Sequence, residues 1–354
     1  MDPISQAALG AAAAQSLSRP EHVLRAGVLG ALAGMAPDLD VLIRSSEDPL
    51  LFLEYHRQFT HSLFFVPIGA LACALVLRPL VARDLSWRTV YLYCLFGFAT
   101  HGLLDGCTSY GTQLLWPFTE LRVAWNNVSI IDPLFTLPLA GIALLAAKTG
   151  RPGRARIAFA WAIAYLLLGV VQRERVESVG LALAERRGHA PARVDAKPAF
   201  GSLLLWKTIY ETDGRFHVDA VHLVLRPTIY EGERRERLSI PRDLPWLDPE
   251  SQQARSLERF RWFSSDALAL DARRPDTVID LRYSMLPNRI DPLWALELDP
   301  TAAAAAHPAF VTFRKLTPAD RRTFFAMLRG ADLSADLGAA SGGPTSEAEA
   351  HRLR

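Results

Sequence analysis

The sequence has few cysteines, little net charge and no recognisable signal peptide. These features argue against a cysteine-ligated zinc or redox protein, a nucleic-acid-binding protein and a protein with a cleaved leader. The formal net charge of the 354 residues is +2, so we expect no nucleic-acid partner. The start, Met1-Asp2-Pro3, lacks a basic n-region and no small-residue cleavage site follows, so we expect no cleaved signal peptide. The three cysteines are too widely spaced for a zinc knuckle or a CxxC redox pair: Cys73, Cys94 and Cys107.

What the chain does have is two unlike halves. Residues 1–172 are dominated by apolar side chains, whereas residues 173–354 are rich in Arg, Asp, Glu and Pro. This contrast predicts a mainly α, multi-helix transmembrane bundle followed by a small α+β domain with an antiparallel sheet. The expected parts are a transmembrane helical domain (1–175), a soluble α+β domain (195–330) and a disordered tail (331–354).

Four apolar segments approach the length of about 20 residues that a helix needs to cross a bilayer. Two weaker segments precede them and are short for full spans, so a helical hairpin buried in the bundle is an equal alternative. The second of these carries glycines at 27, 30 and 34, a spacing that lets helices approach closely in lipid. Buried helices of a large soluble protein are the other alternative. The segments are 4–17, 23–36, 63–82, 90–104, 130–147 and 157–171.

Loop charge orients these segments. Arg and Lys are concentrated in three alternate connections, around 19–25, 78–88 and 148–156. The intervening loops, 37–62 and 107–129, hold only three arginines between them. By the positive-inside rule the basic loops are cytoplasmic. The N-terminus, both poorly basic loops and everything after residue 172 are therefore expected on the outer face, with the lipid bilayer as a partner.

The most chemically specific pair is His101 and Asp105, four residues apart near the end of a predicted helix. That spacing places both side chains on one face, one turn apart, where they can bind one metal ion. Gly106 follows and can end the helix. A histidine hydrogen-bonded to an aspartate in the core is the alternative interpretation.

The 37–62 loop supplies further candidates. Asp38 and Asp40 are two apart, so they can share one side of an extended segment; Asp40 is the preferred ligand, because Asp38 could cap a helix or act as general base. His56 and His61 are five apart and need a break between them to bind one ion. Arg57 is a candidate for holding an anionic substrate group, and a solvated arginine is its alternative.

Asp132, before Pro133, either caps the next helix or supports a ligand histidine or acts as a base. Asp2 and Gln6 could join the site, while His22 falls in a basic loop and is excluded. The topology is assigned from Lys and Arg positions alone. It nevertheless places all the candidate Asp and His residues of the site on the same face of the membrane. Mixed His and Asp ligation suits zinc, with manganese or iron as alternatives. Such an ion lowers the pKa of bound water and makes a nucleophile.

Three strings carry a resemblance to a known family. They are Pro37-Asp38-Leu39-Asp40, His56-Arg57-x-x-Thr60-His61-Ser62, and His101-x-x-x-Asp105 continuing through Thr108, Gly111 and Leu114-Leu115-Trp116-Pro117-Phe118. Over residues 1–175 the chain resembles the membrane-bound metal-dependent hydrolases called domain of unknown function 457, also described as LexA-regulated inner-membrane hydrolases. The resemblance implies a bacterial inner-membrane hydrolase of unsettled substrate. It also implies a histidine near position 6, where this chain has glutamine.

The second half predicts strands at 200–211, 216–225, 278–283 and 293–298, a hairpin turn at Asp213-Gly214, and helices at 254–264 and 321–328. No catalytic motif is found there, and this domain is expected to cap the outward mouth of the bundle. The leading function is metal-dependent hydrolysis of a small-molecule or lipid substrate, such as a phosphoester or lipid headgroup. The alternative is a non-enzymatic metal-binding membrane protein or a transporter. The sequence leaves the oligomeric state open.

Overall fold

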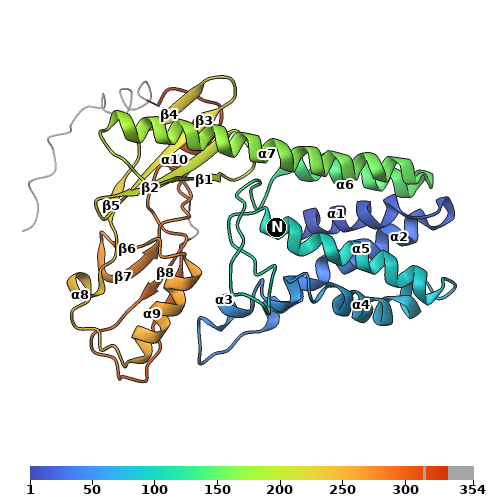
Figure 1. Ribbon diagram of the computed structural model, residues 1–354, viewed down its shortest axis with the longest axis horizontal. Coiled ribbons are helices and arrows are strands. Elements are labelled where there is room, and N and C mark those ends of the chain that lie inside the picture. The colour runs from blue at the N-terminus through green and yellow to red at the C-terminus, as the bar shows by residue number, and fades with distance from the viewer. Residues whose placement is uncertain (314–315, 334–354) are drawn as a thin grey trace, which may run out of the picture.

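The computed structural model describes residues 1–313 and 316–333. It has a helical N-terminal part and a C-terminal part built on antiparallel sheets, joined by one long helix (Figure 1). The tail predicted for 331–354 lies almost wholly outside the described residues. The long helices are α1 (Pro3–Ser16), α2 (Val23–Met35), α4 (Val66–Val81), α5 (Trp87–Gly106), α6 (Pro133–Thr149) and α7 (Pro152–Arg186). Short helical turns join them: η1 (Pro20–His22), η2 (Ala36–Leu42), α3 (Leu51–Tyr55) and η3 (Phe59–His61).

The long helices begin and end at residues suited to those places. Asp2 caps α1 by accepting hydrogen bonds from the amides of residues 4 and 5, and Asp132 caps α6 in the same way. Ser86 caps α5 through the amide of residue 89. Gly150 ends α6 in the left-handed conformation at φ 61°, which glycine adopts without steric cost. Local chemistry therefore sets these boundaries before tertiary packing does.

Helix α7 is longer than the apolar segment that predicts it. Its 35 residues continue past Val171 to Arg186, and the polar second half packs on the C-terminal part. There the Gln172 amide donates to the carbonyls of Leu203 and Leu223, at 3.2 and 3.0 Å. Tertiary contacts thus extend the helix where hydrophobic periodicity gives no signal.

The predicted multi-helix transmembrane bundle is not confirmed. Over the described residues, only α7 is by itself long and apolar enough to cross a membrane. The segment 51–61 and α4 reach that length and hydropathy only when taken together, and the chain bends by 85° between them. Helices α1, α2 and α6 contain 14, 13 and 17 residues, fewer than the roughly 20 that a straight span requires. Large apolar side chains nevertheless remain exposed along α4, α6 and α7, including Leu75, Leu80, Leu137, Leu144, Ile157 and Leu167.

Glycines bring α2 into close contact with its neighbours. A Cβ built on Gly30 would lie 2.3 Å from the Gly10 carbonyl oxygen of α1, and one on Gly97 of α5 would lie 2.3 Å from the Gly30 carbonyl. Gly34 lies against Gly10 and Gly97. The glycine pattern at 27, 30 and 34 therefore serves the close helix packing expected of it.

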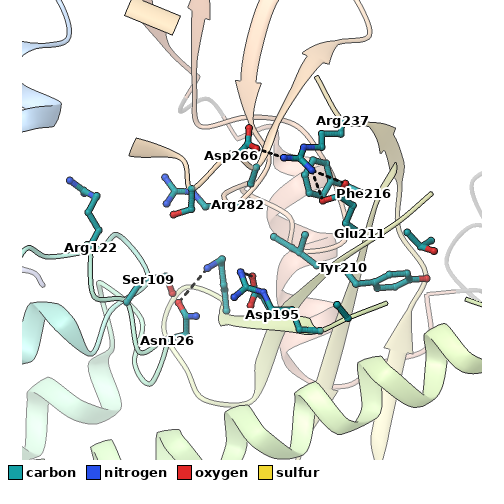
Figure 2. A pocket seen from close by; sticks show the side chains of 18 of the residues that line it. Ser109, Arg122, Asn126, Asp195, Tyr210, Glu211, Phe216, Arg237, Asp266 and Arg282 are labelled. Carbon is teal, nitrogen blue, oxygen red and sulfur yellow. Dashed lines mark hydrogen bonds and ion pairs between the residues drawn. The ribbon is translucent and has the colours of Figure 1, made fainter. Parts of the chain in front are cut away.

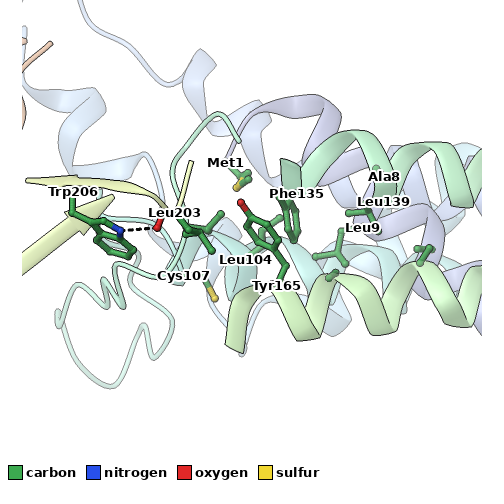
Figure 3. Close-up of a cluster of buried hydrophobic side chains, with 14 of the residues drawn as sticks. Met1, Ala8, Leu9, Leu104, Cys107, Phe135, Leu139, Tyr165, Leu203 and Trp206 are labelled. Atoms are coloured by element: carbon green, nitrogen blue, oxygen red, sulfur yellow. Dashed lines mark hydrogen bonds between the residues drawn. The ribbon is translucent and has the colours of Figure 1, made fainter. Parts of the chain in front are cut away.

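A core cluster connects the helical part to the sheet. Figure 3 shows Phe135 and Tyr165 packed among buried side chains from α1, α5 and α6. The same cluster reaches Leu203 and Trp206 in the C-terminal part. The indole of Trp206 donates to the Leu203 carbonyl at 2.8 Å. The two halves of the chain thus share a hydrophobic core.

The C-terminal part contains two antiparallel sheets, in the orders β1-β2-β3-β4, with β5 on β3, and β6-β7-β8-β9. The predicted hairpin at Asp213-Gly214 is confirmed, with φ values of 49° and 69° between β2 and β3. Several short strands had no clear alternation and were not predicted. The strands are β1 (Val194–Pro198), β2 (Leu205–Thr212), β3 (Arg215–Leu223), β4 (Pro227–Tyr230), β5 (Arg234–Glu236), β6 (Leu268–Asp271), β7 (Arg274–Asp280), β8 (Trp294–Glu297) and β9 (Ala309–Thr312). The helices are α8 (Ile240–Asp243), α9 (Gln252–Phe263) and α10 (Pro318–Leu328).

The second sheet and α9 lie against the two poorly basic loops of the helical part. Arg259 of α9 forms a bidentate ion pair with Asp48 at 2.8 and 2.9 Å and also contacts Glu54. The Tyr283 hydroxyl donates to the Ser109 carbonyl. These contacts place the C-terminal part beside the end of the bundle that carries the candidate site residues (Figure 1).

Candidate metal centre

Four side chains from three separate elements converge at that end of the bundle. Asp38 comes from η2, His61 ends η3, and His101 and Asp105 lie one turn apart on α5. One potential ligand atom from each lies within 4.8 Å of the corresponding atoms of the others. His61, His101 and Asp105 are buried, whereas the Asp38 side chain is 27% exposed. The group therefore has one side open to solvent, and Asp38 lies on it.

Hydrogen bonds orient both imidazoles so that the same nitrogen faces the centre. The Nδ1 of His101 lies 2.5 Å from the Gly34 carbonyl oxygen, to which it donates. The Nδ1 of His61 lies 3.2 Å from Asp40 Oδ2 and 3.0 Å from the Thr60 hydroxyl. The two Nε2 atoms are left facing each other at 2.8 Å. Histidine ligands of metals are typically held in this way, with the outer nitrogen bonded to a carbonyl or carboxylate.

Asp105 supplies the clearest sign that a cation fits. Its Oδ1 accepts from Gln6 Nε2 at 2.9 Å and contacts the amino group of Met1. Its buried Oδ2 accepts no hydrogen bond within the described structure. That atom lies 3.3 Å from His61 Nε2, 3.8 Å from His101 Nε2 and 3.0 Å from Arg57 Nε, the last as an ion pair without hydrogen-bond geometry. Arg57 offsets part of the charge of this buried carboxylate, but Oδ2 still accepts no hydrogen bond, and a cation bound among these atoms would supply the missing partner.

Asp40 lies behind His61 rather than beside the four-residue group. Its Oδ1 lies 2.7 Å from His56 Nδ1, and its Oδ2 accepts from the Thr60 hydroxyl at 2.8 Å and the Arg57 amide at 3.0 Å. With Asp38 and His56 it forms a second, more exposed group whose atoms also lie within 4.8 Å of one another. The structure therefore brings Asp38 to the two imidazoles, where the sequence favoured Asp40.

The carboxylates of the η2 loop are held in the anionic form that a metal requires. Burial raises the pKa of Asp38, but the adjacent imidazoles of His101 and His61 outweigh burial and hold this pKa well below its usual range. Burial likewise opposes ionisation of Asp40, and hydrogen bonds with His56 and His61 lower its pKa below the ordinary value. Both groups are charged at neutral pH.

Arg57 is fixed in an unusual backbone conformation between the site and the C-terminal part. Its φ is 67°, a left-handed value that is strained for a residue other than glycine. The Asp40 carboxylate holds its amide, and its carbonyl accepts from the Gln113 amide at 2.9 Å. The guanidinium donates to the Thr108 hydroxyl at 2.9 Å and lies 4.7 Å from the Tyr110 ring centroid. These contacts place a buried positive charge next to Asp105.

Asp132 and Asp2 are occupied as helix caps. Asp132 accepts from the amide of Leu134 at 3.1 Å and from the Tyr165 hydroxyl at 2.8 Å. Asp2 accepts from the amide and hydroxyl of Ser5. Within the described part of the chain, none of these hydrogen bonds involves the four converging side chains. Gln6, in contrast, contacts Asp105 directly.

Gly102 is a positioning residue that the sequence analysis missed. A Cβ on Gly102 would lie 2.1 Å from the His61 carbonyl oxygen. Only glycine therefore allows η3 to pack on α5 closely enough to bring the His61 and His101 rings to 4.4 Å between centroids. The signal in the sequence was a glycine directly after the most specific histidine.

One family model and two curated proteins match parts of the chain. Residues 1–176 match the family described as YdjM inner membrane protein. The chain is 28% identical over 153 residues to the uncharacterized protein YfhP of Bacillus subtilis, covering 42% of this chain and 46% of that protein. It is 30% identical over 115 residues to the inner membrane protein YbcI of Escherichia coli, covering 31% and 64%. The chain thus spans about half to two thirds of these curated relatives, and no solved structure matches. The family match supports a location at the bacterial inner membrane.

Proposed function

We propose that the part of the chain that matches the YdjM inner membrane protein family, residues 1–176, is a membrane-embedded, metal-dependent hydrolase. A phosphoester or a lipid headgroup is the substrate class that we propose. The observation that carries the proposal is the convergence of two carboxylates and two imidazoles around a buried carboxylate oxygen that has no hydrogen-bond donor. The family name itself is silent about catalysis.

The three buried side chains would hold the ion: His61 and His101 through Nε2, and Asp105 through Oδ2. This donor set fits zinc, and manganese or iron as alternatives. When bound, such an ion supplies a Lewis acid and lowers the pKa of a coordinated water. Asp40 and His56 keep His61 in the required tautomer, and Arg57 and Gln6 hold Asp105 in place.

Asp38 is our candidate for the general base. It lies 3.4 to 3.5 Å from the two Nε2 atoms and is the only partly exposed member of the four. Its carboxylate could accept a proton from an attacking water on the solvent side, once an ion bound by the two imidazoles replaces the contacts that lower its pKa. We prefer Asp38 to Asp132, because the hydrogen bonds of Asp132 serve the α6 cap and Tyr165.

One observation favours the non-enzymatic alternative. If Asp38 also binds the ion, four protein ligands complete a tetrahedral site, as in structural zinc sites, and no position remains for water. The transporter alternative has no comparable support, because the site residues lie at helix ends: His101 and Asp105 in the last two turns of α5, Asp38 in η2 and His61 in η3. The role of Asp38 therefore decides between a catalytic and a structural ion.

Two substitutions test these roles. His101→Ala should lose bound metal and hydrolysis together, while His22→Ala, at the opposite end of the bundle, should keep both. Asp38→Asn should keep most of the metal and lose hydrolysis of whichever phosphomonoester, phosphodiester or phospholipid the wild type cleaves. Wild-type metal content in purified His101→Ala would reject the centre. Full hydrolysis by Asp38→Asn would reject Asp38 as the base.

We also propose that the centre and the C-terminal part face outward, because the basic connections lie at the other end of the helices. Single cysteines in a background without native cysteines would test this. An impermeant maleimide should label Glu47→Cys and Glu250→Cys in intact spheroplasts, and Arg151→Cys only after lysis; all three positions are exposed. Labelling of positions 151 and 250 from the same side would contradict the proposed topology.

A further inference from the structure

A polar cavity lies where the first sheet meets the loop between α5 and α6. Its volume is about 660 Å³, within the range typical of small-molecule sites. Strands β1 and β2 line one side, and Ser109, Arg122 and Asn126 line another (Figure 2). Arg282 and Asp266 of the second sheet region complete it. The cavity is thus built from both halves of the chain.

Most positive charges in this cavity have carboxylate partners. Arg122 has none, but it donates to the carbonyls of residues 110 and 111 and lies within 5.4 Å of three aromatic ring centroids. Lys197 is different: its one described hydrogen bond is to Asn126 Oδ1 at 3.4 Å, the dashed line at Asn126 in Figure 2. The paired cations are Arg193 with Asp195, Arg237 with Glu211 and Asp266, and Arg282 with Asp280.

A second lysine lies directly opposite Lys197. Lys207 of β2 is its cross-strand partner, so both side chains leave the sheet on the same face. Lys197 is 8% exposed and Lys207 is 4% exposed. Lys207 donates to the Ser284 hydroxyl at 2.8 Å and the Arg289 carbonyl at 2.9 Å. Neither ammonium has a carboxylate within 4.0 Å in residues 1–313 and 316–333.

Burying the two ammonium groups of Lys197 and Lys207 side by side destabilises the fold unless an anion binds between them. Like charges directly opposite on antiparallel strands are destabilising, and a buried charge without a partner more so. The chain contains only four lysines among its 39 basic residues, so lysine is not its default surface cation. Burial lowers the pKa of Lys197 to about 8, which leaves it largely charged at neutral pH, and that of Lys207 to about 7, so a bound anion would shift Lys207 toward its charged form. Lys197 lines the large cavity, and both lysines line a smaller adjoining cavity that shares Ser109 and Arg282 with it.

We propose that Lys197 and Lys207 form the floor of a binding site for a phosphate-bearing ligand, whose phosphate lies in the smaller cavity that both lysines line and whose remainder occupies the large cavity beside Lys197. A phosphate monoester is a dianion near neutral pH and matches two adjacent ammonium groups, whereas a single carboxylate would leave one charge uncompensated. The ligand is either a soluble organic phosphate or the headgroup of a lipid. Binding here is independent of the metal centre, although Ser109 of the cavity directly follows Thr108, which holds Arg57 beside Asp105.

Inorganic phosphate is the first probe, titrated into the purified full-length protein by calorimetry and by thermal unfolding. Wild type should bind phosphate and be stabilised by it. Lys197→Met should bind about 30-fold more weakly or worse, as expected for removing one member of a buried charge pair. Without phosphate the same variant should unfold at an equal or higher temperature, because an unpaired buried cation has been removed. Lys148→Met, at an exposed lysine in the last turn of α6, is the matched control and should behave as wild type.

Two further arms separate the possible sites and sources. In the His101→Ala background phosphate should still bind, because the metal centre is not involved; loss of binding there, or unchanged binding in Lys197→Met, overturns the proposal. Absence of phosphate binding to wild type also overturns it. Glycerol phosphate and short-chain phosphatidylglycerol, titrated separately, identify the source as the one that stabilises wild type but not Lys197→Met. Equal stabilisation of both proteins by each compound would contradict the site.

Discussion

Replacing Gly102 by alanine should weaken the metal centre without unfolding the protein. The added Cβ would lie 2.1 Å from the His61 carbonyl oxygen, whereas real Cβ contacts below 3.0 Å are essentially never seen. The backbone of His61 must therefore move by at least the difference, about 0.9 Å. Bonds from a metal to histidine nitrogen tolerate only about 0.2 Å. A shift several times larger should lower metal affinity by about 10–100-fold, the range seen when the support of a ligand is lost.

The global stability should change little. Alanine is favoured over glycine in a helix by about 1 kcal/mol, which offsets part of the roughly 1–3 kcal/mol that overpacking costs. Gly141→Ala is the matched control, because a Cβ there, also in a long apolar helix, would meet no atom within 4 Å. The assay is competition with a chelator of known affinity, combined with thermal unfolding of each variant. A folded Gly102→Ala protein with wild-type metal affinity would refute the argument that His61 is held by this contact and binds the ion.

Two other substitutions have expected outcomes set by single contacts. Asp132→Ala removes the α6 cap and the partner of the Tyr165 hydroxyl. It should lower the free energy of unfolding by about 1–2 kcal/mol and leave the metal content unchanged. A loss of metal in this variant, measured by metal analysis, would instead tie Asp132 to the centre. Burial lowers the pKa of Lys207 to about 7, whereas a lysine in the unfolded chain titrates near 10.4. Between these two pH values the unfolded chain binds more protons than the folded one. The free energy of unfolding should therefore rise with pH, by up to about 1.4 kcal/mol per pH unit. Denaturation at pH 7, 8 and 9 should show this rise in wild type and a smaller rise in Lys207→Met, where Lys197, with a pKa lowered to about 8, still contributes. Parallel curves would contradict a desolvated Lys207.

Sequence alone located the helices of the N-terminal part and the residues of its most specific motif. Each of the six apolar segments overlaps an observed helix, because hydrophobic length and capping residues such as Asp2 and Ser86 act locally. The pairing of His101 with Asp105 on one face also follows from helical spacing alone. The hairpin at Asp213-Gly214 is local in the same sense.

Contacts between distant segments decided the rest. Asp38 and Asp40 are equivalent by spacing, and only the fold of η2 against η3 turns Asp38 toward the imidazoles and Asp40 toward the back of His61. The length of α7 depends on a sheet that forms later in the chain, which hydropathy cannot register. The lysine pair at 197 and 207 exists only through strand register, because nothing within either segment indicates that two positive charges will be buried side by side.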